Sequence, residues 1–308
     1  MQRCFVLLLL PGCGGSDPTS DAVDLREDLP TAPEDGQQFV TPTLTIPAYT
    51  EQQWCSFMRY DGEDVGVSAA GTWQSENGHH AILMISNADA RQYPDGSVLD
   101  CTDRNTLPMT NMEPLVIVKA LEPGRTGMAF PEGMAAKLRG DTRLVLQSHY
   151  INTSPDPILV RDAINLTYVD PDTVETWAAP YAHTLSEMPI PPHEETTLTV
   201  ECTWEEEANV LFLLGHMHEH GTAFSVDWTH ADGTERIYEI PRWDPAMRDS
   251  PPTDDYDAGE FTVAAGDRFT TTCTWLNTTD QVLNFPQEMC VTAGMAYPTL
   301  VPLICDPS

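Results

Sequence analysis

No stretch of this chain keeps apolar residues at helical spacing for three turns. Short apolar runs recur instead, with turn signals between them, such as Pro-Asp-Gly at 94–96 and Asp-Gly at 232–233. The 26 prolines, the 19 glycines and the many Thr and Val residues favour short strands and turns over long helices. The sequence therefore predicts an all-β fold.

The expected strands divide between two halves of the chain. They span residues 81–85, 115–118, 144–150, 163–169, 196–202, 210–218, 224–228 and 268–275. Regular short strands of this kind are typical of antiparallel sandwiches and jelly rolls. A break at Asp170-Pro171-Asp172 predicts an N-terminal domain over 41–172 and a C-terminal domain over 173–308, and the chain is long enough for both.

Residues 1–13 have the pattern of an export signal. Arg3 is the basic residue, residues 5–10 are apolar, and Leu10-Pro11-Gly12-Cys13 resembles a bacterial lipobox, in which Cys13 would be lipidated. A plain cleaved signal is the alternative. Residues 14–40 are acidic and rich in Pro, Ser and Thr, so we expect a disordered tether. These features predict a lipoprotein of the bacterial cell envelope, periplasmic or on the outer surface, or a secreted protein.

The net charge of −32 limits the possible partners. An acidic surface repels nucleic acid and anionic lipid headgroups, which argues against both. The only membrane contact expected is the lipid anchor at Cys13. The charge itself is explained by solubility, and it identifies no substrate.

The cysteine count predicts disulfide bonds. If Cys4 leaves with the signal and Cys13 takes the lipid, six remain at positions 55, 101, 202, 273, 290 and 305. An even number of cysteines in an exported protein points to three disulfides, and six cysteines allow 15 pairings.

The nine histidines are unevenly distributed. His216 and His218 follow an apolar run, and residues at i and i+2 of a strand share a face, so two imidazoles there can bind one metal ion. His220 lies one step further out and is interpreted as a supporting residue. His183, His193 and His230 stand alone and are expected at the surface.

A second candidate site combines His79, His80 and His149. Adjacent strand residues point to opposite faces, so His79 and His80 need a strand end or a distortion, which Asn77-Gly78 would supply. Three imidazoles suit copper, zinc, iron or nickel. Met289 precedes Cys290, a cysteine expected in a disulfide, and its thioether is a soft ligand that favours Cu(I).

Taken in order, these motifs resemble the copper type II, ascorbate-dependent monooxygenases, of which peptidylglycine α-hydroxylating monooxygenase and dopamine β-monooxygenase are members. The motifs are His79-His80, His149-Tyr150, His216-x-His218 and Met289-Cys290, and the resemblance spans about residues 55–305. It implies two tandem antiparallel β-sandwich domains, jelly-roll-like, with one copper on each.

The resemblance also implies a role for each motif. His79, His80 and His149 would hold an electron-transfer copper, with Tyr150 in a supporting position. His216, His218 and Met289 would hold the catalytic copper at which O2 is activated. Ascorbate or another one-electron donor would be the co-substrate. The disulfides would pair Cys55 with Cys101, Cys202 with Cys305 and Cys273 with Cys290.

The chain departs from the family where the substrate would bind. The peptide-hydroxylating enzyme grips a carboxylate with an Arg two residues before its His-x-His, and Leu214 stands here instead. The Asn and Tyr that follow its Met-Cys are Val291 and Ala293. Loss of the guanidinium argues against peptide amidation and favours a small apolar or weakly polar organic substrate. A copper carrier or buffer without turnover is the alternative, and a zinc or structural metal protein is a third, which Met289 argues against.

Overall fold

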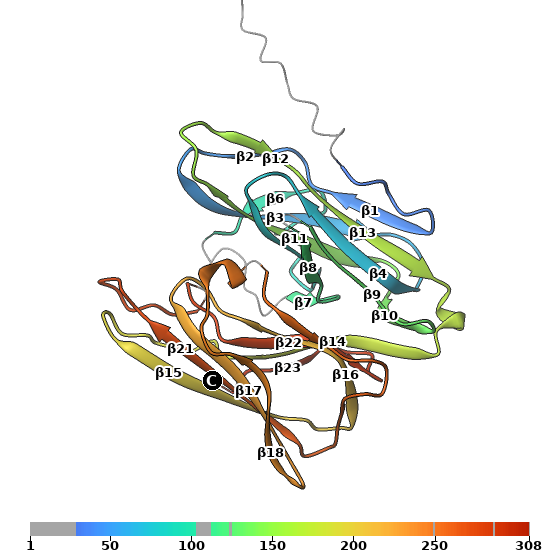
Figure 1. The fold of residues 1–308 in the computed structure, drawn as a ribbon. Coiled ribbons are helices and arrows are strands. Elements are labelled where there is room, and N and C mark those ends of the chain that lie inside the picture. Colours follow the sequence, from blue (N-terminus) through green and yellow to red (C-terminus); the bar gives the residue numbers. More distant parts are fainter. Residues whose placement is uncertain (1–28, 103–111, 123–124, 249, 286, 308) are drawn as a thin grey trace, which may run out of the picture.

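The computed structural model describes residues 29–102, 112–122, 125–248, 250–285 and 287–307 (Figure 1). Within these ranges the chain forms strands and two 3-10 segments, η2 (Pro171–Thr173) and η3 (Pro245–Arg248), and no α-helix. The all-β prediction is confirmed. The predicted export signal, Cys13 and the start of the tether lie outside the described residues. No helix in the described part is long and apolar enough to cross a membrane.

The largest sheet runs through both halves of the chain. Its main path has the order β1 (Gly36–Val40), β13 (Asp162–Val169), β4 (Val65–Gln74), β10 (Met134–Leu138), β14 (Thr176–Thr184), β22 (Val291–Tyr297), β16 (Ala208–His216) and β19 (Thr253–Asp255). The other strands of this sheet are β8 (Lys119–Glu122), β9 (Arg125–Ala129), β20 (Thr262–Val263) and β23 (Leu303–Cys305). The parallel pairing of β10 with β14 joins first-half strands to second-half strands.

Smaller sheets cover this large sheet and complete the sandwich layers (Figure 1). In the first half the order is β6 (Val98–Asp100), β3 (Thr50–Tyr60), β11 (Thr142–Asn152), β5 (Gly78–Ser86) and β7 (Met112–Pro114). In the second half it is β15 (Glu195–Thr203), β21 (Arg268–Leu276), β17 (Gly221–His230) and β18 (Gly233–Ile240). The short strands β2 (Leu44–Ile46) and β12 (Ile158–Val160) pair with each other.

Two large apolar clusters fill the layers. One lies within the second half and is built around Trp275, Phe269 and Phe224. The other joins residues of the first-half strands to second-half residues, which include Leu214 and Met295. Since both the large sheet and this cluster cross the break at 170–172, the division into domains 41–172 and 173–308 stays a prediction.

The predicted tether and one of the predicted strands differ from the structure. The predicted tether over 14–40 is too long, because residues Gly36–Val40 form β1 and pair with β13, with Phe39 buried opposite Ile164. The predicted strand over 115–118 does not form. Leu115 and Val116 are buried in the cluster shared by the two halves, but the backbone between β7 and β8 is irregular. The apolar residues of this run suggested a strand, but they serve burial here and not strand pairing.

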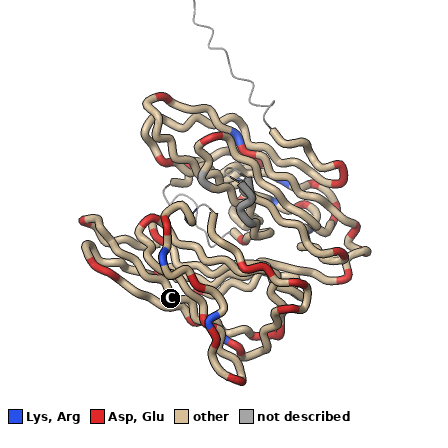
Figure 2. Tube along the Cα trace, viewed as in Figure 1, with Lys and Arg blue, Asp and Glu red and all other residues tan. Residues whose placement is uncertain are grey.

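All three predicted disulfides are present: Cys55–Cys101, Cys202–Cys305 and Cys273–Cys290. They are compatible with an exported protein, because disulfides persist in oxidising compartments. Figure 2 shows acidic residues spread over the loops and strand ends of both halves.

Candidate metal centre

His216 and His218 lie at the end of β16 with their rings together. The strand ends at His216, so the two residues do not share one continuous strand as the sequence predicted. Their Nε2 atoms nevertheless lie 3.1 Å apart, with the ring planes at 85°. Met217 between them is fully buried in the apolar cluster of the second half. The buried Met217 fixes the direction in which both neighbouring imidazoles leave the backbone.

The contacts of His218 determine which ring nitrogen can bind a metal. Its Nδ1 lies 3.0 Å from the carbonyl oxygen of Gln287. A carbonyl only accepts hydrogen bonds, so Nδ1 carries the proton and Nε2 of the neutral ring keeps its lone pair. When two nitrogens bind one metal ion, each at about 2.0 Å from the metal, the distance between the two nitrogens is close to the distance between the Nε2 atoms of His216 and His218. The pair therefore fits one metal ion.

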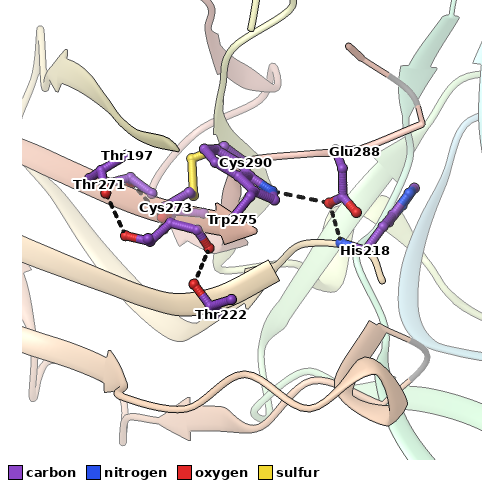
Figure 3. The surroundings of a disulfide bond; sticks show 10 residues. Thr197, His218, Thr222, Thr271, Cys273, Trp275, Glu288 and Cys290 are labelled. Atoms are coloured by element: carbon purple, nitrogen blue, oxygen red, sulfur yellow. Dashed lines mark hydrogen bonds between the residues drawn. A yellow bond between two sulfur atoms is a disulfide. The ribbon is translucent and has the colours of Figure 1, made fainter. Parts of the chain in front are cut away.

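The segment carrying Met289 is fixed beside this pair. Glu288 and Cys290 on either side are both fully buried, and Met289 itself is partly buried. Cys290 is bonded to Cys273 of β21, as Figure 3 shows. Glu288 accepts a hydrogen bond from the backbone N–H of His218, so this segment lies against the residues that follow β16. The thioether of Met289 as a third ligand stays a prediction.

Glu288 is a residue of this site that the sequence did not indicate. Its carboxylate is completely buried, and burial raises its pKa above the usual value although N–H donors of His220, His218, Trp275 and Met289 oppose the shift. The available signal was its position in Glu288-Met289-Cys290. A carboxylate next to a disulfide cysteine and a candidate ligand has a fixed backbone and needs partners.

The first-half pair is formed by strands β5 and β11. His80 lies directly opposite His149 in the register, and their ring centroids are 4.8 Å apart with the planes at 75°. The irregular entry expected before His79-His80 is present, because Asn77 has a φ of 67° and the register shifts between His149 and Tyr150. The side chain of His79 lies outside the described residues, so its part in this site stays a prediction.

Glu51 of β3 orients His149, a contact that the sequence did not indicate. Its Oε1 lies 2.8 Å from Nε2 of the buried His149. The carboxylate accepts the Nε2 proton, which directs the lone pair of the neutral ring to Nδ1. A carboxylate that holds one imidazole nitrogen in this way is a common support for a metal ligand. Only the pairing of β3 with β11 brings these residues together.

Tyr150 lies in a buried polar network behind the His80–His149 pair. Its hydroxyl donates to Asp162 Oδ1 at 2.6 Å, and both residues are fully buried. Burial raises the pKa of Asp162 to about 6. Gln74 donates from Nε2 to the backbone oxygen of His80 at 3.1 Å. Tyr150 thus supports the neighbouring strands from the core, and its role toward a metal stays a prediction.

The expected surface position of His183 is wrong. Its ring is buried among Tyr181, Trp204 and Phe269, and desolvation lowers its pKa to about 4. Aromatic neighbours from β14, β21 and the segment after β15 enclose it, and these are far apart in the sequence. Of the other isolated histidines, His193 is exposed and pairs with Asp280, while His230 stacks on Trp228.

Neither predicted ligand set has three imidazoles among the described side chains. Among the described residues, no three His, Cys, Asp or Glu side chains are placed to hold one metal ion. Each candidate site has two imidazoles close together. The predicted third ligand of one site is the His79 ring, which lies outside the described side chains. The predicted third ligand of the other is the Met289 thioether, which is a different type of donor. The imidazoles at both positions are donors that suit copper, as they also suit zinc, iron or nickel.

Comparisons with known proteins identify no family. No protein-family model and no curated protein matches the chain. Among solved structures, it is similar to the major capsid protein P2 from bacteriophage PM2, with 8% identity, 84% of this chain and 97% of that chain covered, and a TM-score of 0.33. A putative secreted protein from Eubacterium rectale has 7% identity, coverages of 87% and 71%, and a TM-score of 0.22. These values are too low to support a conclusion about function.

Proposed function

We propose that this protein is an exported copper-dependent monooxygenase that hydroxylates a C–H bond of a small organic substrate. O2 and ascorbate, or another one-electron donor, are the co-substrates. The observation that carries the proposal is the convergence of the His216 and His218 Nε2 atoms at 3.1 Å beside the segment of Met289. The separate His80–His149 pair and the order of the motifs support it.

Each ligand set is assigned a different task. His216, His218 and Met289 hold the catalytic copper, and His79, His80 and His149 hold the electron-transfer copper. When bound, copper supplies the one-electron redox chemistry that activation of O2 needs. The protein's own contribution is orientation: Gln287 fixes the ring of His218, and Glu51 fixes the ring of His149. Imidazoles held in this way need little rearrangement when a metal binds.

The surroundings of Leu214 support an apolar substrate. Leu214 of β16 lies opposite Ala293 of β22, and both are buried in the cluster shared by the halves. Val291 packs against the same cluster. A substrate carboxylate placed there would lose its hydration without gaining a cationic partner, which is unfavourable. The substrate is therefore expected to be neutral and small.

Ascorbate-driven O2 uptake by the copper-loaded protein, measured against a panel of small organic compounds, tests the proposal. We expect one or more neutral compounds to increase uptake and to yield a hydroxylated product. His216→Ala with His218→Ala is the matched control and should abolish the substrate-dependent part. Tight copper binding without substrate-dependent uptake would instead identify a copper carrier or buffer. Preferential retention of zinc would exclude both copper functions.

A further inference from the structure

Glu288 contacts His218 and directly precedes Met289 in the candidate site formed by His216, His218 and Met289. Its carboxylate is fully buried, and the residues after β16, at 217–220, pass over it; we call these residues the His turn. Oε2 accepts the backbone N–H of His218 at 3.0 Å, and Oε1 accepts the backbone N–H of His220 at 2.7 Å. Oε2 also accepts the indole N–H of Trp275 at 3.0 Å, as Figure 3 shows.

The other contacts of the His turn are arranged around this carboxylate. The carbonyl oxygen of His218 accepts the indole N–H of Trp243 at 3.0 Å, and that of His220 accepts the N–H of Leu276 at 2.9 Å. Glu288 therefore accepts the backbone N–H groups of His218 and His220, while the carbonyl oxygens of the same two residues accept hydrogen bonds from Trp243 and Leu276. On its other side, the peptide bond to Met289 continues directly to the Cys273–Cys290 disulfide.

We propose that Glu288 is the positioning residue of the catalytic copper site. It connects the His turn to the Met289 segment, so that the imidazole of His218 and the thioether of Met289 keep one relative arrangement with or without metal. This inference rests on the proposed function. Three N–H donors depend on this one buried carboxylate, and a buried donor left without its acceptor is costly, so the arrangement resists distortion.

Glu288→Gln is the most direct test because it preserves the shape of the side chain. Both oxygens of Glu288 act only as acceptors toward N–H groups, whereas an amide has one oxygen and an NH2 group that only donates. In either orientation the NH2 group of the glutamine faces an N–H donor. It meets His220 in one orientation, and His218 together with Trp275 in the other. The variant must therefore lose one or more bonds to the His turn.

Glu219→Gln is the matched control. Glu219 lies between His218 and His220 in the same turn, but its side chain is half-exposed and pairs with Arg248. The same Glu-to-Gln change at position 219, between the two histidines, thus leaves the buried carboxylate of Glu288 intact.

Hydrogen exchange of the metal-free protein provides the first measurement. In the wild type, the His218 and His220 amides should be as protected as amides within β16, although they lie outside a strand. Glu288→Gln should raise their exchange rates by about 10-fold or more, while the β16 and β21 amides stay unchanged. Glu219→Gln should change them by less than about 2-fold, as expected for a surface substitution. Unprotected His218 and His220 amides in the wild type would overturn the proposal without any variant.

X-ray absorption of the Cu(I)-loaded protein provides the second measurement. Glu288→Gln should weaken or remove the sulfur scatterer while the nitrogen ligands remain, and Glu219→Gln should match the wild type. An unchanged sulfur scatterer in Glu288→Gln would overturn the positioning role. Loss of protection spread evenly over the second half would do the same, because it would indicate a general structural role. A wild-type spectrum without sulfur would refute the proposed ligand set. The exchange rates of the His218 and His220 amides would still show whether Glu288 holds the His turn in place.

Discussion

Replacing Met289 with isoleucine keeps the volume of the side chain nearly constant and removes the sulfur. The free energy of unfolding should therefore change by less than about 1.5 kcal/mol. Soft sulfur discriminates in favour of Cu(I), so loss of binding should fall on the reduced metal, while His216 and His218 still hold Cu(II). We expect X-ray absorption of the reduced variant to lack the sulfur scatterer and ascorbate-dependent hydroxylation to collapse.

A core role for Met289 predicts the opposite result. Stability would fall modestly, while the copper spectrum and turnover would stay near those of the wild type. An unaltered sulfur scatterer in Met289→Ile would therefore contradict both the ligand assignment and the monooxygenase proposal. The spectrum separates the two cases because a core side chain has no direct bond to the metal.

His183 should make folding stability depend on pH. Its pKa is lowered to about 4 by desolvation, so between the unfolded value of about 6.5 and pH 4 the unfolded state binds the additional proton. Stability from this residue is therefore complete above pH 6.5 and is lost as pH falls toward 4. The loss at pH 5 should be about 2 kcal/mol.

The measurement must separate His183 from Asp162. The pKa of Asp162 is raised to about 6, so its folded state binds the additional proton and its contribution to stability is lost as pH rises. Urea unfolding of wild type and His183→Phe at several pH values isolates the histidine, because Asp162 contributes equally to both. Parallel stability profiles of the two proteins between pH 7.5 and 5 would contradict the buried neutral histidine.

Among the elements, the Cys273–Cys290 bond joins β21 to the segment that carries Glu288 and Met289. It closes a loop with a sequence separation of 17. Replacing both cysteines with alanine should lower the free energy of unfolding by about 3 kcal/mol and broaden the sulfur signal of Cu(I). Replacing Cys55 and Cys101 is the control: it should destabilise the protein but leave that signal intact. Equal effects of the two double variants on copper would show that the bond has no local role at the site.

Whether a feature could be predicted from the sequence depends on how far apart the contacting residues lie along the chain. Strands such as β11 and β13 were predicted within a few residues because their apolar runs are local. The contact of Glu51 with His149 was not predicted, because it requires knowing that β3 pairs with β11 and in which register. The same holds for His183, whose aromatic surroundings exist only after the sheets pack. The histidines of both candidate sites could be predicted from sequence motifs. The carboxylates that orient them could not, because strand pairing and packing bring them to the histidines.

At the scale of the whole molecule, the two halves share structure that the predicted division separates. The parallel pairing of β10 with β14 continues one sheet across the break. Leu214 and Met295 of the second half pack in the same cluster as first-half residues such as Leu144. Burial of this shared apolar surface opposes relative movement of the halves. The two proposed metal sites should therefore keep a fixed separation.

Two separate imidazole pairs predict two coppers per chain. Each pair is supported by its own carboxylate, Glu51 for His149 and Glu288 for the His turn, so loss of one site should leave the other intact. Metal analysis after reconstitution should give two coppers for the wild type. Replacing His79 and His80 together should leave one, and that copper should keep the sulfur scatterer assigned to Met289.

Loss of both coppers in this variant would show that the sites are not independent, because the shared sheet and apolar cluster would then carry the disturbance from one half to the other. One copper in the wild type itself would reduce the protein to a single-site binder and remove the electron-transfer role of the His80–His149 pair.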